Sequence, residues 1–267
     1  KTNFVQSVLM AVNQVVLADQ GDAYISFLFE HAGMDEHVLC VPPDHPRLRA
    51  LRGTTVLREV QLRRTLFNSF GEVLGSDAAL RQRFLQSMAL ITSRGISGLG
   101  FPLTLCPVLD FANHASTGKH NNAEFRCNPD DMSFELHAMR NIEAGEEVCI
   151  NYGQARDASS FMSLYSFHAG SSEHDWVEVG GERVLIDELL RWKKHQASPM
   201  HKHIGALSTQ DKVTLLRDVE AALEARSGFD VSSPDHENEG WFAGAWDIVH
   251  RERQALEECK RSIETLL

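Results

Sequence analysis

The residues most able to do chemistry lie close together in the segment LDFANHA, residues 109–115. An apolar run there brings the carboxylate of Asp110, and then the adjacent side chains of Asn113 and His114, into a short turn. A carboxylate, an amide and an imidazole side by side can bind a charged ligand. The simpler interpretation is that His114 only packs in this turn, so a second chemical group is needed to decide.

That second group is the tyrosine of the segment EEVCINYG, residues 146–153. Ile150 and Tyr152 alternate with polar residues as in a strand, and Gly153 ends it, which would leave the phenol at the mouth of the strand. Tyr165 and Phe167 follow in SLYSFHAG. The three rings predict aromatic walls around a slot. The alternative is a tyrosine that closes the core with its hydroxyl in water, followed by an aromatic helix end.

Other kinds of chemistry have weaker support in the sequence. His114 has no partner at a metal-ligand spacing, and His201 and His203 of HKH lie in a polar linker, so no metal is expected. A nucleophilic pair of Cys106 or Cys149 with His114 lacks the helix N-terminus or basic cluster that would activate the thiol. The sequence contains no GxxxxGK[ST] phosphate-binding motif.

Composition limits the partners of the chain. It has 267 residues, 43% of them hydrophobic and 24% charged, with a formal net charge of -11. This acidic balance disfavours nucleic acid and suits a basic partner such as a lysine-bearing protein segment. The five cysteines are scattered without a CxxC pair, which indicates a reducing intracellular compartment; cytoplasm or nucleus is expected, with an organelle as the open alternative. No apolar run approaches the roughly 20 residues that a membrane helix needs.

The first part of the chain has a helical pattern. Apolar residues recur at helical spacing from Phe4 to Val16, and Thr54 or Thr55 can cap a later helix. Another helix begins at SDAAL. Up to Ser93 the chain is therefore predicted to be mostly helical.

The pattern then changes to strands and back to helices. GISGLGF is typical of a loop, whereas AEFRCN and MSFELHAM predict a hairpin around PDD. Helices return beyond residues 176–179, with a capping box at Ser208 and Asp211 and a last helix from Trp246 to Leu267. This order of elements predicts an α+β fold.

Taken in order, DFANH, the hairpin, INYG and LYSFHAG resemble the motif blocks of the SET-domain methyltransferases. ITSRGI, residues 91–96, resembles the Ser-Arg step that precedes those blocks. The helical insert, including LRALRGTTVLREV, and the helical tail are similar to the branch typified by plant Rubisco large-subunit methyltransferase, which also includes an actin-histidine methyltransferase. The resemblance covers residues 1–179 well, and the tail matches only as a helical region.

The resemblance implies a compact, β-rich SET fold of the β-clip type with an inserted helical subdomain and a C-terminal helical domain. The implied domains are residues 1–22 as a helix leading into the insert, 23–92 as the insert, 93–179 as the C-terminal part of the SET domain, and 180–267 as a C-terminal helical domain like the one that binds Rubisco.

The resemblance also implies a cofactor and a reaction. The cofactor is S-adenosyl-L-methionine, and the implied reaction is N-methylation of a lysine in a non-histone protein by a monomeric enzyme that needs no metal. The residues implied to bind the cofactor are Arg94, Asn113, His114, Tyr152 and Phe167.

The implied substrate slot shares some of these residues. It is lined by Arg94, Asp110, Tyr152 and Tyr165. Tyr152 is the catalytic residue, because its hydroxyl orients the lone pair of the amine. Asp110 lies on the substrate side, where a carboxylate favours a cationic lysine.

One departure from the family leaves alternatives open. Family members carry a Gly-rich strand-turn before the insert that embraces the cofactor, and Gly98-Leu99-Gly100 lies on the wrong side of the insert. Because the chain opens within a predicted helix, we expect that segment to precede Lys1. The alternatives are a catalytically silent SET-like binding module and a protein-histidine methyltransferase.

Overall fold

The computed structural model describes residues 2–72, 75–98, 101–115, 120–128, 130–131, 133–153, 156–191, 199–227 and 239–267. The chain forms two compact units. Unit 1 comprises residues 1–41, 62–154 and 164–169, and unit 2 comprises residues 42–61, 155–163 and 170–267. Within the described ranges, no helix is both long and apolar enough to cross a membrane.

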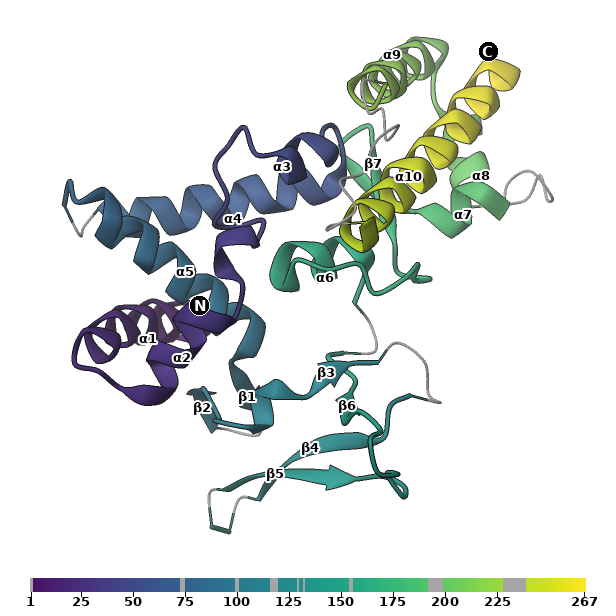
Figure 1. The fold of residues 1–267 in the computed structure, drawn as a ribbon. Helices are drawn as coiled ribbons and strands as arrows, with labels where there is room; N and C mark the ends of the chain where they lie inside the picture. Colours follow the sequence, from purple (N-terminus) through teal and green to yellow (C-terminus); the bar gives the residue numbers. More distant parts are fainter. Residues whose placement is uncertain are drawn as a thin grey trace. The chain divides into compact units, whose positions relative to one another are not determined.

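The helices of unit 1 come first in the chain (Figure 1). They are α1 (Thr2–Asp19), α2 (Ala23–His31), the 3-10 turn η1 (Met34–Glu36), the larger part of α4 (Thr55–Gly71), and α5 (Ala78–Arg94). Asp22 caps α2 by accepting a hydrogen bond from the amide of Ile25 at 2.9 Å. The predicted start of a helix at SDAAL is confirmed, because Asp77 accepts from the amides at the start of α5. Helix α1 packs on α5.

The strands of unit 1 are short. β1 (Ile96–Gly98) and β2 (Phe101–Thr104) pair antiparallel, so the prediction of a loop at GISGLGF is wrong. The segment carries three glycines and is followed by Pro102, which hides a strand pattern from sequence inspection. The predicted hairpin is confirmed as β4 (Ala123–Asn128) and β5 (Ser133–Ala138), which run side by side in Figure 1.

The remaining strands of unit 1 form a parallel pair. After the 3-10 turn η3 (Leu109–Phe111), β3 (Asn113–His114) pairs with β6 (Cys149–Ile150). Asn122, which is fully buried, fixes this pairing: its amide group donates to the Glu147 carbonyl at 2.8 Å and its Oδ1 accepts from the Cys149 amide at 2.9 Å. A small apolar core of Ala112, Ala123 and Ile150 lies beneath it.

Unit 2 is mostly helical. It contains α3 (Pro46–Ala50), the start of α4, most of α6 (Ala158–Tyr165), the antiparallel pair β7 (Trp176–Val179) and β8 (Glu182–Leu185), α7 (Ile186–Arg191), α8 (Pro199–Ala206), α9 (Thr209–Ala225) and α10 (Glu239–Leu266). The predicted caps are confirmed: Thr54 accepts from the amide of Leu57, and Ser208 accepts from the amide of Asp211. Strand β8 was not predicted, and the prediction that the last helix begins at Trp246 is wrong by almost two turns.

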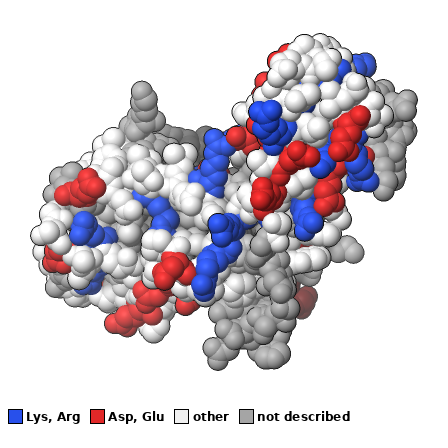
Figure 2. Space-filling view, turned by 90° about the horizontal axis from the view of Figure 1, so that it is seen from above, with Lys and Arg blue, Asp and Glu red and all other residues white. Residues whose placement is uncertain are grey.

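The core of unit 2 lies between α9, α10 and the β7–β8 hairpin, with Val177, Leu189, Leu256 and Ile263 fully enclosed. The outer face of α10 carries ion pairs such as Arg253–Glu257 and Lys260–Glu220. On the face drawn in Figure 2, basic and acidic side chains are interspersed rather than separated by sign. The domain boundaries that the resemblance implies stay predictions.

Candidate active site

The parallel pairing of β3 with β6 brings the Asn-His pair next to the segment that carries the tyrosine. The amide of Ala115 donates to the carbonyl of Ile150 at 2.9 Å, and two residues later the amide of Tyr152 donates to Nδ1 of His114 at 3.2 Å. The prediction of a turn at Asn113 and His114 is therefore wrong, since they form a strand. The second strand ends at Ile150 rather than at Gly153, which leaves Tyr152 in the bend that follows.

Four aromatic rings gather at this bend. The ring centroid of Tyr152 lies 5.3 Å from that of His114, 4.9 Å from that of Tyr165 and 6.4 Å from that of Phe167. The rings of His114 and Phe167 are 6.0 Å apart. The predicted cluster of Tyr152, Tyr165 and Phe167 is confirmed as a contact, and all of its members keep part of their surface accessible.

His37 and Ser166, which sequence inspection missed, take part in hydrogen bonds that fix the segment carrying Tyr165 and Phe167. One ring nitrogen of His37, Nε2, donates to the carbonyl of Leu164 at 3.2 Å, and the other, Nδ1, accepts from the amide of Leu39. Next to it, the amide of Val38 donates to the hydroxyl of Ser166, which has a positive φ of 59°. The chain thus turns sharply after α6 and presents Tyr165 and Phe167 to the same side.

The hydroxyl of Tyr152 donates to the carbonyl oxygen of Ala112 at 2.8 Å. Burial raises the pKa of Tyr152 to about 12, and the nearby Tyr165 and Asp110 add to the increase, while Arg94 opposes it. The phenol is therefore neutral near pH 7. It keeps its proton directed at a backbone oxygen, and its own lone pairs remain able to accept a hydrogen bond.

A charged group lies two residues before Ala112. Nη1 of Arg94, at the end of α5, donates to the carbonyl of Asp110 at 2.9 Å and lies 3.8 Å from its Oδ2. The hydroxyl of Tyr24 donates to the same Oδ2 at 2.5 Å. Burial raises the pKa of the Asp110 carboxyl, while the Tyr24 hydrogen bond and the Arg94 charge lower it. Tyr24 was missed because it lies 86 residues upstream, within the apolar run AYISFLF.

Six of the seven predicted site residues come together in unit 1. Arg94 and Asp110 are in contact, and both act electrostatically on Tyr152 of the aromatic cluster. Asn113 differs, because its side-chain amide points to Glu147 at the surface and donates to its Oε1 at 2.6 Å. Its backbone pairs with β6, so any contribution of Asn113 to this site comes from the main chain. The roles assigned to these residues stay predictions.

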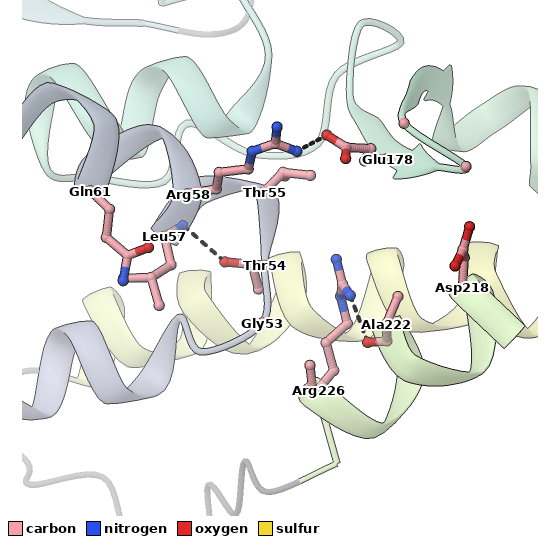
Figure 3. Close-up of a pocket in the computed structure, with 13 residues that line it drawn as sticks. Gly53, Thr54, Thr55, Leu57, Arg58, Gln61, Glu178, Asp218, Ala222 and Arg226 are labelled. Carbon is pink, nitrogen blue, oxygen red and sulfur yellow. Dashed lines mark hydrogen bonds and ion pairs between the residues drawn. The ribbon is translucent and has the colours of Figure 1, made fainter.

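A pocket lies within unit 2. It has a volume of about 450 Å³ and lies between the start of α4, the β7–β8 turn and the end of α9 (Figure 3). Its side chains already contact one another: Arg58 pairs with Glu178, and Arg226 donates to the carbonyl of Ala222 at 2.7 Å. None of the predicted site residues lines this pocket. Within the part of the chain that the structure describes, no group of three or more His, Cys, Asp and Glu side chains could hold a metal ion.

The site in unit 1 can now be compared with known proteins. The profile of the SET domain matches residues 18–153, just over half of the chain, and includes Asp110, the Asn-His strand and Tyr152. The chain belongs to the SET domain family. The predicted family and the α+β class of the fold are thus confirmed.

Relatives of known structure or sequence agree with this family. The chain is 27% identical over 126 residues to SET domain-containing protein 8 of Schizosaccharomyces pombe, an alignment that spans 44% of this chain and only 28% of that protein. Its fold is similar to the SET domain of LSMT solved with lysine and AdoHcy, with a TM-score of 0.59 and 14% identity, covering 92% of this chain and 71% of the other. Rubisco LSMT bound to AdoMet is similar with a TM-score of 0.54 and 14% identity over 86% and 68% of the two chains.

Proposed function

We propose that this SET-domain chain is an S-adenosylmethionine-dependent protein methyltransferase that methylates a lysine side chain of a non-histone protein. The observation that carries the proposal is the Tyr152 hydroxyl, held on the Ala112 carbonyl within a cluster of aromatic rings. Support comes from the SET family and from the fold shared with LSMT, which was solved with lysine, AdoHcy and AdoMet. The acidic net charge of -11 suits a lysine-bearing partner.

The described residues fit a positively charged cofactor. Ring faces attract cations, and the cluster offers the rings of His114, Tyr152 and Phe167. The carboxyl oxygen Oδ1 of Asp110 is buried with no hydrogen-bond partner among the described residues, so an unsatisfied acceptor lies nearby. Asn113, His114, Phe167 and Arg94 are the residues that we expect to hold the cofactor. When bound, S-adenosylmethionine supplies an activated methyl group.

The chain's own residues would act by positioning the amine. A lysine side chain has a pKa of about 10.4 in water, and a neutral amine is the nucleophile. Transfer into the aromatic cluster removes water from the ammonium group and lowers its pKa. Tyr152 is neutral, so its oxygen can accept a hydrogen bond from the amine and orient the lone pair. Such alignment can supply much of the rate of an in-line displacement.

A methyl-transfer assay with a matched variant tests the proposal. The intact protein is incubated with labelled S-adenosylmethionine and a protein extract, and the modified residue is identified by mass spectrometry. We expect methyl-lysine with the native protein and labelling at least about 100-fold slower with Tyr152→Phe, because misplaced reactants lose rate on that scale. Equal labelling by both proteins would remove Tyr152 from the mechanism. Methyl-histidine as the product would overturn the lysine assignment, and no cofactor binding in calorimetry would indicate a silent module.

A further inference from the structure

Two residues from separate parts of unit 1 meet at Asp110. Tyr24 comes from α2, Arg94 from the last turn of α5, and Asp110 from the 3-10 turn that leads into β3. The Tyr24 hydroxyl donates a hydrogen bond to Oδ2 of the Asp110 carboxylate. Arg94 donates to the backbone carbonyl of Asp110 and lies farther from its carboxylate. The side chain of Asp110 has no exposed surface, so a ligand reaches its carboxylate only when the residues around it move.

The second carboxyl oxygen is the unusual feature. Oδ1 of Asp110 is buried and has no hydrogen-bond partner among the described residues. Buried acceptors are almost always paired, because a buried oxygen without a donor loses the hydrogen bonds that it made to water. The Tyr24 hydroxyl donates to one carboxyl oxygen, whereas the other oxygen accepts no hydrogen bond from the described residues. This difference points to a ligand for Oδ1.

The electrostatic neighbours of Asp110 favour a cationic ligand. Besides its own backbone amide, the described residues that interact with its carboxyl group are Tyr24 on α2, Arg94 on α5, Cys106 before η3 and Tyr152 after β6. Only one of these four, Arg94, carries a positive charge, and its shortest bond goes to the backbone oxygen. A carboxylate in this setting attracts an ammonium group more strongly than it would in water.

We propose that Tyr24 is a positioning residue, whose hydroxyl holds Oδ2 of Asp110 so that the ionised carboxylate presents Oδ1 to the cationic side chain of the substrate lysine. This inference rests on the proposed lysine methyltransferase function and adds to it a residue outside the motif blocks. Tyr24 acts before the amine loses its proton, when the side chain still arrives as an ammonium ion. It touches neither the amine nor the methyl group.

The variant Tyr24→Phe tests this role, and Asp22→Ala is its matched control. Both changes are in or next to the first turn of α2, but Asp22 only caps the helix through the amide of Ile25. We expect Tyr24→Phe to raise the KM for a lysine peptide about tenfold, the loss typical of one hydrogen bond to a charged group, with kcat within about twofold. Asp22→Ala should leave both constants close to native. Equal effects of the two variants would mean that Tyr24 only stabilises α2, and would overturn the proposal.

The pH profile provides a readout that a merely structural role would not change. The Tyr24 hydrogen bond lowers the pKa of the Asp110 carboxyl, so its removal raises that pKa. The carboxyl then stays neutral to a higher pH, and the acid limb of kcat/KM moves to higher pH in Tyr24→Phe but not in Asp22→Ala. An unchanged acid limb in Tyr24→Phe would contradict the proposal.

A measurement without turnover separates this inference from the proposed function. Carbon-13 NMR of the aspartate carboxyl groups, with the Asp110 signal assigned from Asp110→Asn, follows the titration directly. We expect the Asp110 carboxyl to titrate at a higher pH in Tyr24→Phe than in the native protein, and an identical titration overturns the role of Tyr24. A native protein that neither methylates nor binds a lysine peptide overturns the proposed function and the substrate part of this inference, whereas the NMR result still decides whether Tyr24 controls Asp110.

Discussion

The backbone amide of Tyr152 donates a hydrogen bond to Nδ1 of His114. This bond adds to the β3–β6 ladder and to the Tyr152–Ala112 hydrogen bond, which also join the two motif blocks of the family, and it pairs a main-chain group with an imidazole. It requires that Nδ1 carry no proton, which places the ring proton on Nε2. The same imidazole packs against the rings of Tyr152 and Phe167.

Replacement of His114 by Phe separates these two contributions. The variant keeps an aromatic ring beside Tyr152 but leaves the amide of Tyr152 without an acceptor, which costs about 1 kcal/mol or slightly more at a partly buried position. We expect urea unfolding to show this loss, together with slower methyl transfer. The control is His120→Phe at an exposed position, which should change the free energy of unfolding by less than about 0.5 kcal/mol. Native-like stability and activity of His114→Phe would show that the bond is dispensable.

Tyr152 should ionise late in an alkaline titration. Its pKa in the folded protein is about 12, whereas an unfolded tyrosine has a pKa of about 10. Between about pH 10 and about pH 12 the folded state therefore keeps a proton that the unfolded state has lost. The contribution of Tyr152 to stability falls as the pH rises above about 10. The difference in absorbance at 295 nm between the native protein and Tyr152→Phe should appear near pH 12. A difference that is complete by pH 10.5 would contradict the burial of the phenol.

Glu252 should be essential for the stability of unit 2. It is almost fully enclosed on α10, pairs with Arg226 at 2.6 Å and accepts from the amide and hydroxyl of Thr55 at the start of α4. Glu252→Gln leaves the buried guanidinium without a counter-charge, and we expect a loss of about 3 kcal/mol in the free energy of unfolding. Glu257→Gln, on the same helix but with a side chain 46% exposed, should cost less than about 0.5 kcal/mol. Similar unfolding midpoints for the two variants would refute this account.

Gly53 should not tolerate a side chain. Its φ is +80°, and a Cβ atom there would lie 2.7 Å from the carbonyl oxygen of Ala225 at the end of α9. Gly33 has a φ of +64° but open space around it. Gly33→Ala should therefore lower the free energy of unfolding by about 1 kcal/mol through backbone strain alone. Gly53→Ala has the same strain and a steric overlap that costs about 1–3 kcal/mol more. Thermal unfolding compares the two, and equal shifts in Tm would show that the close approach relaxes freely.

The sequence predicted the helical first part, the β4–β5 hairpin and the aromatic cluster because each depends on local pattern or on adjacent residues. The spacing of apolar residues in α1 and α5 and the alternation around Phe134 and Leu136 are periodic signals. Tyr165 and Phe167 follow Tyr152 at the end of the single helix α6 and just beyond it, so all three rings come from one stretch of the chain. The family resemblance then ordered these pieces correctly.

The contacts that were missed join residues far apart in the chain. Tyr24 with Asp110, and His37 with Leu164, are single hydrogen bonds across 86 and 127 positions, and no periodicity records such a partner. The parallel pairing of Asn113 and His114 was also hidden, because two residues are too few to show alternation. The sequence therefore pointed to residues that lie together in unit 1, but not to the distant residues that contact them.

The ladder of β3 and β6 has a consequence for how the protein acquires its site. The two strands are separated in sequence by the whole β4–β5 hairpin. Forming the ladder therefore costs the entropy of closing a long loop, and in return pairs only two residues of each strand. Contacts of this kind form slowly. We therefore expect the hairpin to assemble first and to carry β6 to β3 afterwards, which would make the Tyr152–His114 contact one of the last steps of folding. In pulsed hydrogen exchange, the amide of Tyr152 should gain protection after the amides of the hairpin.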